Sequence, residues 1–442
     1  MRRDDYDGVQ ERPGGRAAAG RPGPEERGRA DTLLGGKVAA LLVAVGISFL
    51  SLGFLFPLYS LYAREAIGAN STEIGLMAST FLVAGFLSAP AIGSLADRLG
   101  HGRVLWIALA THSLVVLGYI AARKPEHLLG LRALEGVAAM GVLPPARALM
   151  NGMAPRHRQG EAMGLMSSAE MAGVLLGPAV GAVLASQVGF TGSFLVSGMG
   201  LGLVSAWVFF VLPTGGAETE VGSTKLLGAT RKAFTPPLIT AYLLRLLLSV
   251  PQGVATAVWS LYMADRGASL LLIGLSFTTF ALPAILAAPA AGRISDRHGR
   301  FWPIVAGLVS SGAIYSAYGF PLMPVIIVLL SLGEGTGAAA ARSSVDGLLA
   351  DSVPSGIRGR VQANFGAADI AGALLGASGG GILYTVGPGI PFLLEGLLMI
   401  LVAGLLFVPA VSRLLHRPKS AGSPVAEDGL GGGSRNPGTA SF

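Results

Sequence analysis

Twelve long apolar stretches, separated by short polar gaps, limit what this 442-residue chain can fold into. A helix needs about 20 mostly apolar residues to cross the hydrocarbon core of a bilayer, and each stretch is roughly that long. Only 13% of the residues are charged, whereas a soluble globular chain carries about 25%. We therefore predict an all-α membrane protein with twelve transmembrane helices rather than a water-soluble enzyme. The predicted helices cover residues 38–63, 73–95, 104–121, 127–150, 162–187, 193–212, 238–263, 271–293, 302–320, 323–349, 361–385 and 391–411.

Counts of a few residue types exclude several classes of site. The chain has no Cys, which excludes disulfides, thiolate metal sites and a Cys nucleophile. It has 65 Gly without a Gly-X-Y period, and small residues inside apolar stretches indicate helices that pack closely within a bilayer. The formal net charge of +7 falls in the gaps between apolar stretches instead of on a polar domain, so we expect no nucleic-acid partner.

The distribution of Lys and Arg predicts which side of the membrane each gap faces. Gaps after even-numbered helices and both terminal segments are basic, whereas gaps after odd-numbered helices hold only Arg64, Arg123, Lys124 and Arg266. The positive-inside rule therefore predicts a multi-pass protein of the inner (plasma) membrane with both termini in the cytoplasm. Residues 1–36 are predicted to be a disordered tail and not a signal peptide, because the apolar run after Lys37 is too long. Residues 413–442 are predicted to be a second flexible tail.

The second half of the chain repeats the first at a shift of 199 residues. Positions that coincide include Ile74 with Ile273, Asp97 with Asp296, Glu135 with Glu334, and Gly173 with Gly372; with one residue of slip, Tyr62 falls on Tyr262. Parallel repeats of six helices are a known transporter architecture, with the substrate site between the halves near the bilayer midplane. We predict two pseudo-symmetric six-helix bundles at 37–212 and 237–412, joined by a cytoplasmic linker at 213–236.

Several short segments resemble motifs of the major facilitator superfamily. Residues 93–100 (GSLADRLG) resemble its loop signature between helices 2 and 3, and residues 292–300 (GRISDRHGR) repeat it between helices 8 and 9. Residues 53–57 resemble a first-helix motif and 132–136 a fourth-helix motif. Gly173, Gly177, Pro178 and Gly181 resemble the fifth-helix motif associated with drug–proton antiporters. The resemblance covers about residues 38–411 and implies transport by twelve helices.

The resemblance also implies a cytoplasmic latch, made of Asp97, Arg98, Arg103, Asp296, Arg297, Arg300 and Asp351. A carboxylate can accept hydrogen bonds from the N–H groups of a facing helix N-terminus. Asp97 would thereby join the first half to helix 11, and Asp296 would join the second half to helix 5. Arg300 could pair with Asp351, but His101 and Gly152 stand at the matching first-half positions, so Arg103 or Asn151 would have to substitute there. The alternative is that these charges only end helices and fix the topology.

Four acids inside predicted helices are candidates for proton coupling: Glu135, Glu170, Glu334 and Asp369. Charges within the membrane are costly and usually functional, and desolvation disfavours the anion of a carboxyl group, which favours proton binding near neutral pH. Static ion pairs are the alternative. Arg132 lies three residues before Glu135 on one helix face, and Arg245 could pair across the cavity with Glu334 or Asp369. Glu395, on the peripheral twelfth helix, is expected to be structural.

Two further features have a functional and a structural interpretation. Pro178 and the neighbouring glycines would bend the fifth helix and favour rocking of the halves, or they would only permit close packing. Phe56, Tyr59, Trp259 and Tyr262 could stack against an amphiphilic substrate, whereas aromatics near Tyr62 and Tyr262 could instead form an interfacial belt.

No phosphate-binding loop or catalytic constellation is present, so we expect no cofactor and no enzymatic activity. The leading hypothesis is proton-coupled efflux of small amphiphilic compounds by alternating access, in which proton and substrate compete. A proton-coupled importer of a sugar or organic acid is one alternative, and a non-transporting membrane sensor is another. We expect a small-molecule substrate, protons and the lipid bilayer as partners, and a monomer.

Overall fold

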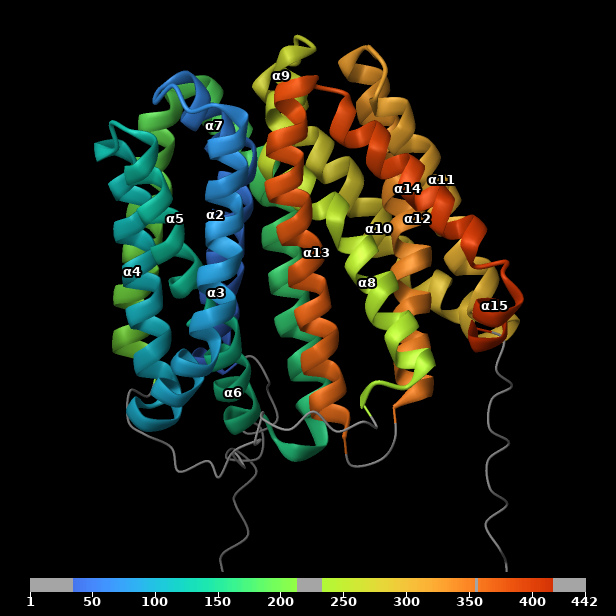
Figure 1. Cartoon of the computed structure of the whole chain (residues 1–442). Coiled ribbons are helices and arrows are strands. Elements are labelled where there is room, and N and C mark those ends of the chain that lie inside the picture. The colour runs from blue at the N-terminus through green and yellow to red at the C-terminus, as the bar shows by residue number, and fades with distance from the viewer. Residues whose placement is uncertain (1–34, 213–232, 354–356, 416–442) are drawn as a thin grey trace, which may run out of the picture.

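The computed structural model describes residues 35–212, 233–353 and 357–415, and within these ranges the chain is helical and has no strand (Figure 1). Most of the predicted linker at 213–236 and most of both predicted tails lie outside the described residues. The helices stand side by side in two groups, one containing α2–α7 and the other mainly α8–α14 (Figure 1). We call residues 35–212 the first half and residues 233–415 the second half.

The first half consists of α2 (Gly36–Glu65), α3 (Ser71–Leu99), α4 (His101–Ala121), α5 (Pro125–Met140), α6 (Leu143–Met153), the short 3-10 helix η1 (Arg156–Arg158) and α7 (Gln159–Val211). The second half consists of α8 (Pro236–Val254), the π-helix η3 (Ala255–Trp259), α9 (Ser260–Asp265), α10 (Leu270–His298), α11 (Phe301–Tyr318), α12 (Pro324–Ser352), α13 (Arg358–Val386), α14 (Ile390–Leu405) and α15 (Pro409–Leu415).

These elements give twelve membrane spans, as predicted. Among the described residues, nine helices are long and apolar enough to cross a membrane, or ten if the bent pair α14–α15 is one span. This count treats the 53-residue α7 as one span, although Gly189 at φ 69° divides it into two. It also leaves out the 18-residue α11, which is the twelfth span. Two predicted spans are present but not continuous helices: the fourth, Pro125–Met153, is interrupted between α5 and α6, and the chain turns by 88° between α14 and α15.

Local sequence signals set where the equivalent helices begin and end. The side chain of Asn70 accepts a hydrogen bond from the N–H of Glu73, whose side chain accepts from the N–H of Asn70, so α3 begins with a capping box. Ser269, 199 residues later, caps α10 with its own side chain. Gly100 and Gly299 have φ angles of 94° and 89°, which glycine adopts at little cost. The sequence repeat is therefore also a repeat of turn geometry.

Small residues allow helices within each half to approach closely. A Cβ atom at Gly177 of α7 would lie 2.8 Å from the Cα atom of Gly53 on α2. A Cβ atom at Gly376 of α13 would overlap the carbonyl oxygen of Val250 on α8. Gly177 and Gly376 are repeat mates, that is, residues 199 positions apart that occupy equivalent places in the two halves. The pairs α2–α7 and α8–α13 therefore pack in the same way.

Small residues also form two equivalent crossings between the halves. At the first, a Cβ atom at Gly75 of α3 would lie 3.0 Å from the Cα atom of Gly381 on α13. At the second, a Cβ atom at Gly274 of α10 would lie 2.6 Å from the carbonyl oxygen of Pro178 on α7. Gly75 and Gly274 are repeat mates, so these crossing contacts follow the internal symmetry.

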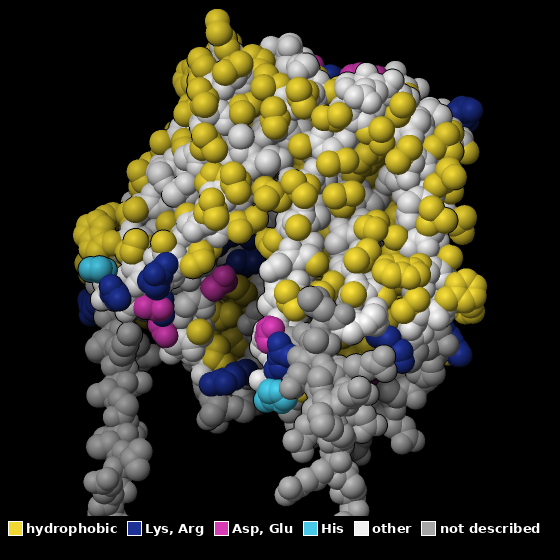
Figure 2. Space-filling view, turned by 180° about the vertical axis from the view of Figure 1, so that it is seen from behind, with side chains coloured by type: hydrophobic (Ala, Val, Ile, Leu, Met, Phe, Trp, Pro, Cys, Tyr) yellow, Lys and Arg dark blue, Asp and Glu magenta, His cyan; other side chains and the backbone are white. Residues whose placement is uncertain are grey.

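The two ends of the bundle differ. We call the end at which α2 begins and α15 lies the tail end, and the opposite one the far end (Figure 1). Polar contacts between the halves lie towards the far end, and they are Arg64–Asp265 at 2.7 Å, Ser79–Ser378 at 2.6 Å and Thr278 Oγ1 to the Leu175 carbonyl at 2.9 Å. Hydrophobic side chains cover the middle of the molecule, and a hollow flanked by charged side chains opens near the tail end (Figure 2).

Candidate functional site

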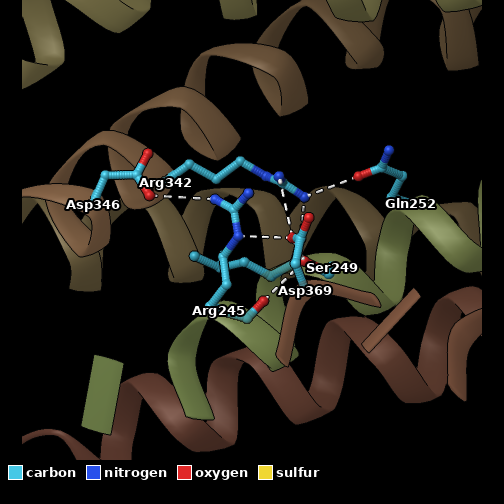
Figure 3. A network of polar contacts seen from close by, with 7 residues as sticks. Arg245, Ser249, Gln252, Arg342, Asp346 and Asp369 are labelled. Carbon is cyan, nitrogen blue, oxygen red and sulfur yellow. Dashed lines mark hydrogen bonds and ion pairs between the residues drawn. The ribbon is translucent and has the colours of Figure 1, made fainter. Parts of the chain in front are cut away.

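Six polar side chains form a network between α8, α12 and α13, and they are Arg245, Ser249, Gln252, Arg342, Asp346 and Asp369 (Figure 3). Asp369, near the middle of α13, is the centre of the network. Its Oδ1 atom lies 2.7 Å from Nε of Arg245 and 3.9 Å from Nη1 of Arg342. The hydroxyl of Ser249 donates a hydrogen bond to the same carboxylate oxygen. The predicted pairing of Arg245 is therefore observed with Asp369 and not with Glu334.

The two arginines of this network have further partners. Arg245 donates to Oδ1 of Asp346 at 3.4 Å, and Arg342 donates to the carbonyl of Leu248 at 2.8 Å and to Gln252 at 3.3 Å. The Asp369 side chain is 32% exposed, whereas the Arg245 side chain is 16% exposed. Asp369 is thus the carboxylate that both guanidinium groups face, and each guanidinium has other partners as well.

A second cluster lies in the first half, where Arg132 and Glu135 of α5 form the predicted local pair. Nη1 of Arg132 donates to Oε2 of Glu135 at 2.8 Å, and the hydroxyl of Tyr119 on α4 donates to the same oxygen. Nε2 of His112 lies 3.6 Å from Oε1 of Glu135. All four side chains are buried. The guanidinium of Arg132 also lies 4.4 Å from the ring centroid of Tyr59, and the carboxylate of Glu135 is ion-paired in this conformation.

Glu334, the repeat mate of Glu135, has a different environment. It is buried on α12, and the hydroxyl of Tyr318 donates to its Oε2 atom at 3.0 Å. No ion pair to Glu334 is found in the part of the chain that the structure describes. Glu170, the repeat mate of Asp369, instead pairs with Arg147 of α6 at 3.2 Å. The four predicted coupling acids thus occupy four distinct environments.

A small pocket lies where the two halves meet. It is lined by Leu52, Leu55, Phe56, Tyr59, Arg132 and Thr256. Phe56 stacks on Phe277 of α10, with ring centroids 6.3 Å apart. The hydroxyl of Tyr59 and Nε of Arg132 are buried without a hydrogen-bond partner among the described residues. Two of the predicted stacking residues, Phe56 and Tyr59, therefore face a shared polar and aromatic pocket.

The other two predicted stacking residues lie elsewhere. Trp259 donates to Ser276 at 2.7 Å, and Tyr262 donates to the carbonyl of Tyr318 at 2.6 Å. Tyr262 is fully buried, and its ring lies 4.5 Å from that of Phe392. Neither residue lines the pocket, and neither forms an interfacial belt, because both pack inside the second half. The apolar periodicity of the helix did not reveal which face they occupy.

The predicted latch residues lie at the tail end, but only some of them form ion pairs. Nη1 of Arg300 lies 2.7 Å from Asp296 and its Nε lies 3.0 Å from Asp351, so the predicted Arg300–Asp351 pair is present. In the first half, Nε2 of His101 lies 3.8 Å from Oδ1 of Asp97, and among the described residues neither Arg103 nor Asn151 forms a pair that would substitute for Arg300–Asp351. Within the described ranges, Asp97 forms no hydrogen bond to α13 and Asp296 forms none to α7. Arg98, Arg103 and Arg297 form no ion pair there.

The fifth-helix motif packs against α2. Cβ atoms at Gly173 and Gly177 would lie within 2.6–2.8 Å of α2 backbone atoms, and Gly181 faces the carbonyl of Phe54. Pro178 leaves α7 helical around it, because the non-helical position is Gly189. This geometry corresponds to the close-packing interpretation and not to a sharp bend at the proline.

Several residues of these clusters were not among the predicted sites. His112, Tyr119 and Tyr318 complete the clusters around the buried acids, and Arg342 and Asp346 complete the network around Asp369. Tyr119 and Tyr318 stand 199 residues apart, so the repeat itself contained the signal for them. Among the described residues, no group of three His, Asp or Glu side chains could hold a metal ion.

Comparison with known proteins connects this architecture to characterised families. The family model described as "Major Facilitator Superfamily" matches residues 41–251 and 242–437. The chain is 27% identical over 319 residues to a "Multi-drug resistance efflux pump PmrA homolog" of Lactococcus lactis subsp. lactis (strain IL1403), covering 70% of this chain and 78% of that protein. It is 28% identical over 343 residues to "Multidrug resistance protein MdtG" of Enterobacter lignolyticus (strain SCF1), covering 73% of this chain and 81% of that protein.

Solved structures share the fold at lower identity. The nucleoside transporter NupG aligns with a TM-score of 0.70 at 13% identity, covering 87% of this chain and 100% of NupG. A bacterial homolog of the human lysosomal transporter Spinster aligns with a TM-score of 0.70 at 14% identity, covering 86% of this chain and 97% of that one. At such identities the likeness concerns the fold alone.

Proposed function

The chain belongs to the Major Facilitator Superfamily and is a transporter rather than an enzyme, and from this premise we propose that it exports small amphiphilic compounds in exchange for protons. The curated relatives at 27–28% identity are described as multidrug efflux or resistance proteins, which favours export. We further propose that the tail end is cytoplasmic, because basic residues are concentrated in the gaps at that end.

Alternating access is supported by the arrangement of the two ends. Among the described residues, the polar contacts between the halves lie towards the far end, and the hollow opens near the tail end (Figure 2). Asp97 and Asp296, also at the tail end, form no hydrogen bond to the other half there. With the tail end cytoplasmic, this conformation would load substrate from the cytoplasm or the inner leaflet. Closing the tail end and separating the far end would expose the site to the outside.

The observation that carries proton coupling is the position of Asp369 between Arg245 and Arg342 within the membrane region. In the outward-open state, a proton from outside would neutralise Asp369 and free both arginines. Their altered positions would weaken substrate binding, and loss of the proton inside would restore the original network. Substrate and proton would therefore not be held together.

The proposal is tested in proteoliposomes with an imposed pH gradient and a panel of neutral, cationic and anionic fluorescent amphiphiles. Wild type should drive at least one dye against its gradient, dissipate the pH gradient while doing so, and fail without it. Asp369→Asn should abolish the coupled flux, whereas Glu126→Gln, at an exposed position of α5, should not. Dye movement in the same direction as the protons would show an importer and overturn export. Equal coupled flux in Asp369→Asn would overturn the role of Asp369.

A further inference from the structure

A groove lies between α3 and α13, where the first half meets the second. It has a volume of about 460 Å³, and ligand pockets in proteins have volumes of about 300–1,000 Å³. It is lined from α13 by Leu374 and Ser378, and from α3 by residues that include Leu76, Thr80, Val83 and Leu87. The groove is separate from the Asp369 network and from the pocket around Phe56.

The groove opens on the outside of the bundle. Its α3 residues recur every three or four positions, so they share one face of the helix. Leu76, Val83 and Leu87 on this face are exposed, whereas Ile74 and Met77 on another face of α3 are buried. Both α3 and α13 stand at the front of the view in Figure 1. The exposed face therefore points away from the interior of the first half and towards the bilayer.

The position of the groove along α3 places it in the hydrocarbon layer. α3 begins at the far end with Ser71, and a rise of about 1.5 Å per residue places Leu76 and Leu87 roughly 8 and 24 Å along the helix. The hydrocarbon core of a bilayer is about 30 Å thick. The groove therefore lies mainly in the leaflet at the far end, where acyl chains surround the protein.

The lining of the groove suits a hydrocarbon and not a polar group. Ser79 donates to the carbonyl of Gly75 at 2.8 Å, and its hydroxyl oxygen lies 2.6 Å from that of Ser378. Thr80 donates to the carbonyl of Leu76 at 2.8 Å, so the hydroxyl groups of the lining already have partners. The other side chains that line the groove are aliphatic. A polar ligand group would lose its hydrogen bonds to water there, which costs free energy.

The groove depends on the angle at which α3 and α13 cross. The two helices touch where Gly75 meets Gly381, and the groove extends from this crossing towards the tail end. In the alternating access proposed above, closure of the tail end brings the parts of α3 and α13 beyond the crossing together, which narrows the groove. A ligand that binds one of two conformations more tightly shifts the equilibrium towards it. An occupant of the groove therefore favours the conformation that is open at the tail end.

We propose that the groove binds an acyl chain of a phospholipid from the far-end leaflet, and that the bound chain holds α3 and α13 apart. The binding of the chain follows from the groove alone, whereas its effect on conformation rests on the alternating access of the proposed function. The chain leaves the groove before the tail end closes, so a bilayer lipid acts as a ligand of one state of the transporter.

Photolabelling in liposomes tests the binding of the chain. The vesicles consist of phosphatidylcholine and include a phosphatidylcholine with a diazirine on one acyl chain, and mass spectrometry locates the adducts after illumination. Adducts should concentrate on residues 76–87 and 374–378. The reference is the exposed stripe of α7 that contains Leu203 and Phe210. Equal labelling of the groove and of this stripe would show ordinary contact with the bilayer and would overturn the proposal.

Two variants that fill the groove sharpen this test. Ala84→Phe and Val83→Phe each place a ring at a lining position, and both should lose the groove adducts while keeping those on α7. Val83 is exposed, so its substitution leaves the packing of the first half intact if Ala84→Phe does not fold. The matched control is Ala206→Phe, at an exposed position on the α7 stripe, which should keep the groove adducts. Unchanged groove adducts in both filling variants would overturn the proposal.

A distance measurement tests the effect of the chain on conformation. Spin labels at Lys124→Cys and Met323→Cys, both exposed at the far end, report how far that end is open. The ring in Ala84→Phe or Val83→Phe replaces the chain permanently, so the population open at the far end should be smaller than in Ala206→Phe. An equal or larger population would overturn the effect on conformation.

The outcomes for this site and for export are distinguishable, because neither measurement depends on transport. Groove adducts without dye flux driven by the pH gradient would refute export and support the chain site. Intact dye flux without groove adducts would refute the chain site and support export.

Discussion

Breaking the polar contacts at the far end should shift the protein away from the conformation described here. Arg64 of α2 pairs with Asp265 of α9 at 2.7 Å, and the hydroxyl of Tyr384 on α13 donates to the same aspartate at 2.5 Å. Arg64 belongs to the first half, so its pair with Asp265 holds the two halves together. Opening of the far end must break that pair.

The expected change in the open population follows from how far the Arg64–Asp265 ion pair is exposed to solvent. The Arg64 and Asp265 side chains are 32% and 34% exposed, and partly exposed pairs are typically worth about 0.2–1 kcal/mol. Arg64→Ala should therefore raise the population that is open at the far end by up to about fivefold. Asp265→Ala removes the same ion pair between the halves; the hydrogen bond that it also removes, from Tyr384, lies within the second half and need not break on opening. We therefore expect shifts of similar size in Asp265→Ala and Arg64→Ala.

The assay is a distance measurement between spin labels. The chain has no Cys, so a labelled pair needs only two substitutions, Lys124→Cys in the first half and Met323→Cys in the second, both exposed at the far end. The longer-distance population should grow to a similar extent in Arg64→Ala and in Asp265→Ala relative to wild type. Arg123→Ala is the control, because Arg123 donates only to carbonyls of its own half within the described residues. Equal distributions in Asp265→Ala and Arg123→Ala would refute the reasoning.

Two further predictions concern stability, measured by thermal unfolding in lipid or detergent. Gly177→Ala should destabilise the protein by about 1–3 kcal/mol, because the added Cβ meets the backbone of α2. Gly164→Ala in the same helix meets open space and should instead be neutral or stabilising, by up to about 1 kcal/mol. Arg132→Ala should cost about 3–5 kcal/mol by leaving the buried carboxylate of Glu135 without its cation. Adding Glu135→Gln should recover part of that loss; a strictly additive or larger loss would contradict the pairing.

The fold was predictable from the sequence because bilayer thickness sets the length of each span, and the repeat fixed its internal symmetry. The division at Gly189 was predicted too, because it lies in the gap between the predicted spans 162–187 and 193–212. The break between α5 and α6 was not predicted, because it lies inside an apolar run. Hydropathy alone does not distinguish a continuous helix from a kinked one when both are equally apolar.

The candidate site was predictable only in part: Arg245 and Asp369 were predicted, but Arg342, Asp346 and the partners of each residue were not. Spacing on one helix identified Arg132 with Glu135, since neighbours three residues apart share a face. The choice of Asp369 over Glu334 as the partner of Arg245 depends on how α8 packs against α13, which sequence spacing does not determine. Similarly, Glu395 was assigned a structural role from its helix alone; the structure shows in addition that it is 4% exposed and that both carboxyl oxygens lack a hydrogen-bond partner among the described residues.

The crossing contacts at Gly75–Gly381 and Gly274–Pro178 have a mechanical consequence. At both points backbone atoms of one half lie against backbone or small side chains of the other, so the crossings themselves would offer little steric resistance if the halves turned about the line that joins them. We expect that line to act as a pivot. The barrier to conversion should then reside in a few polar contacts at the ends, which explains why single substitutions there should have measurable effects on the conformational equilibrium.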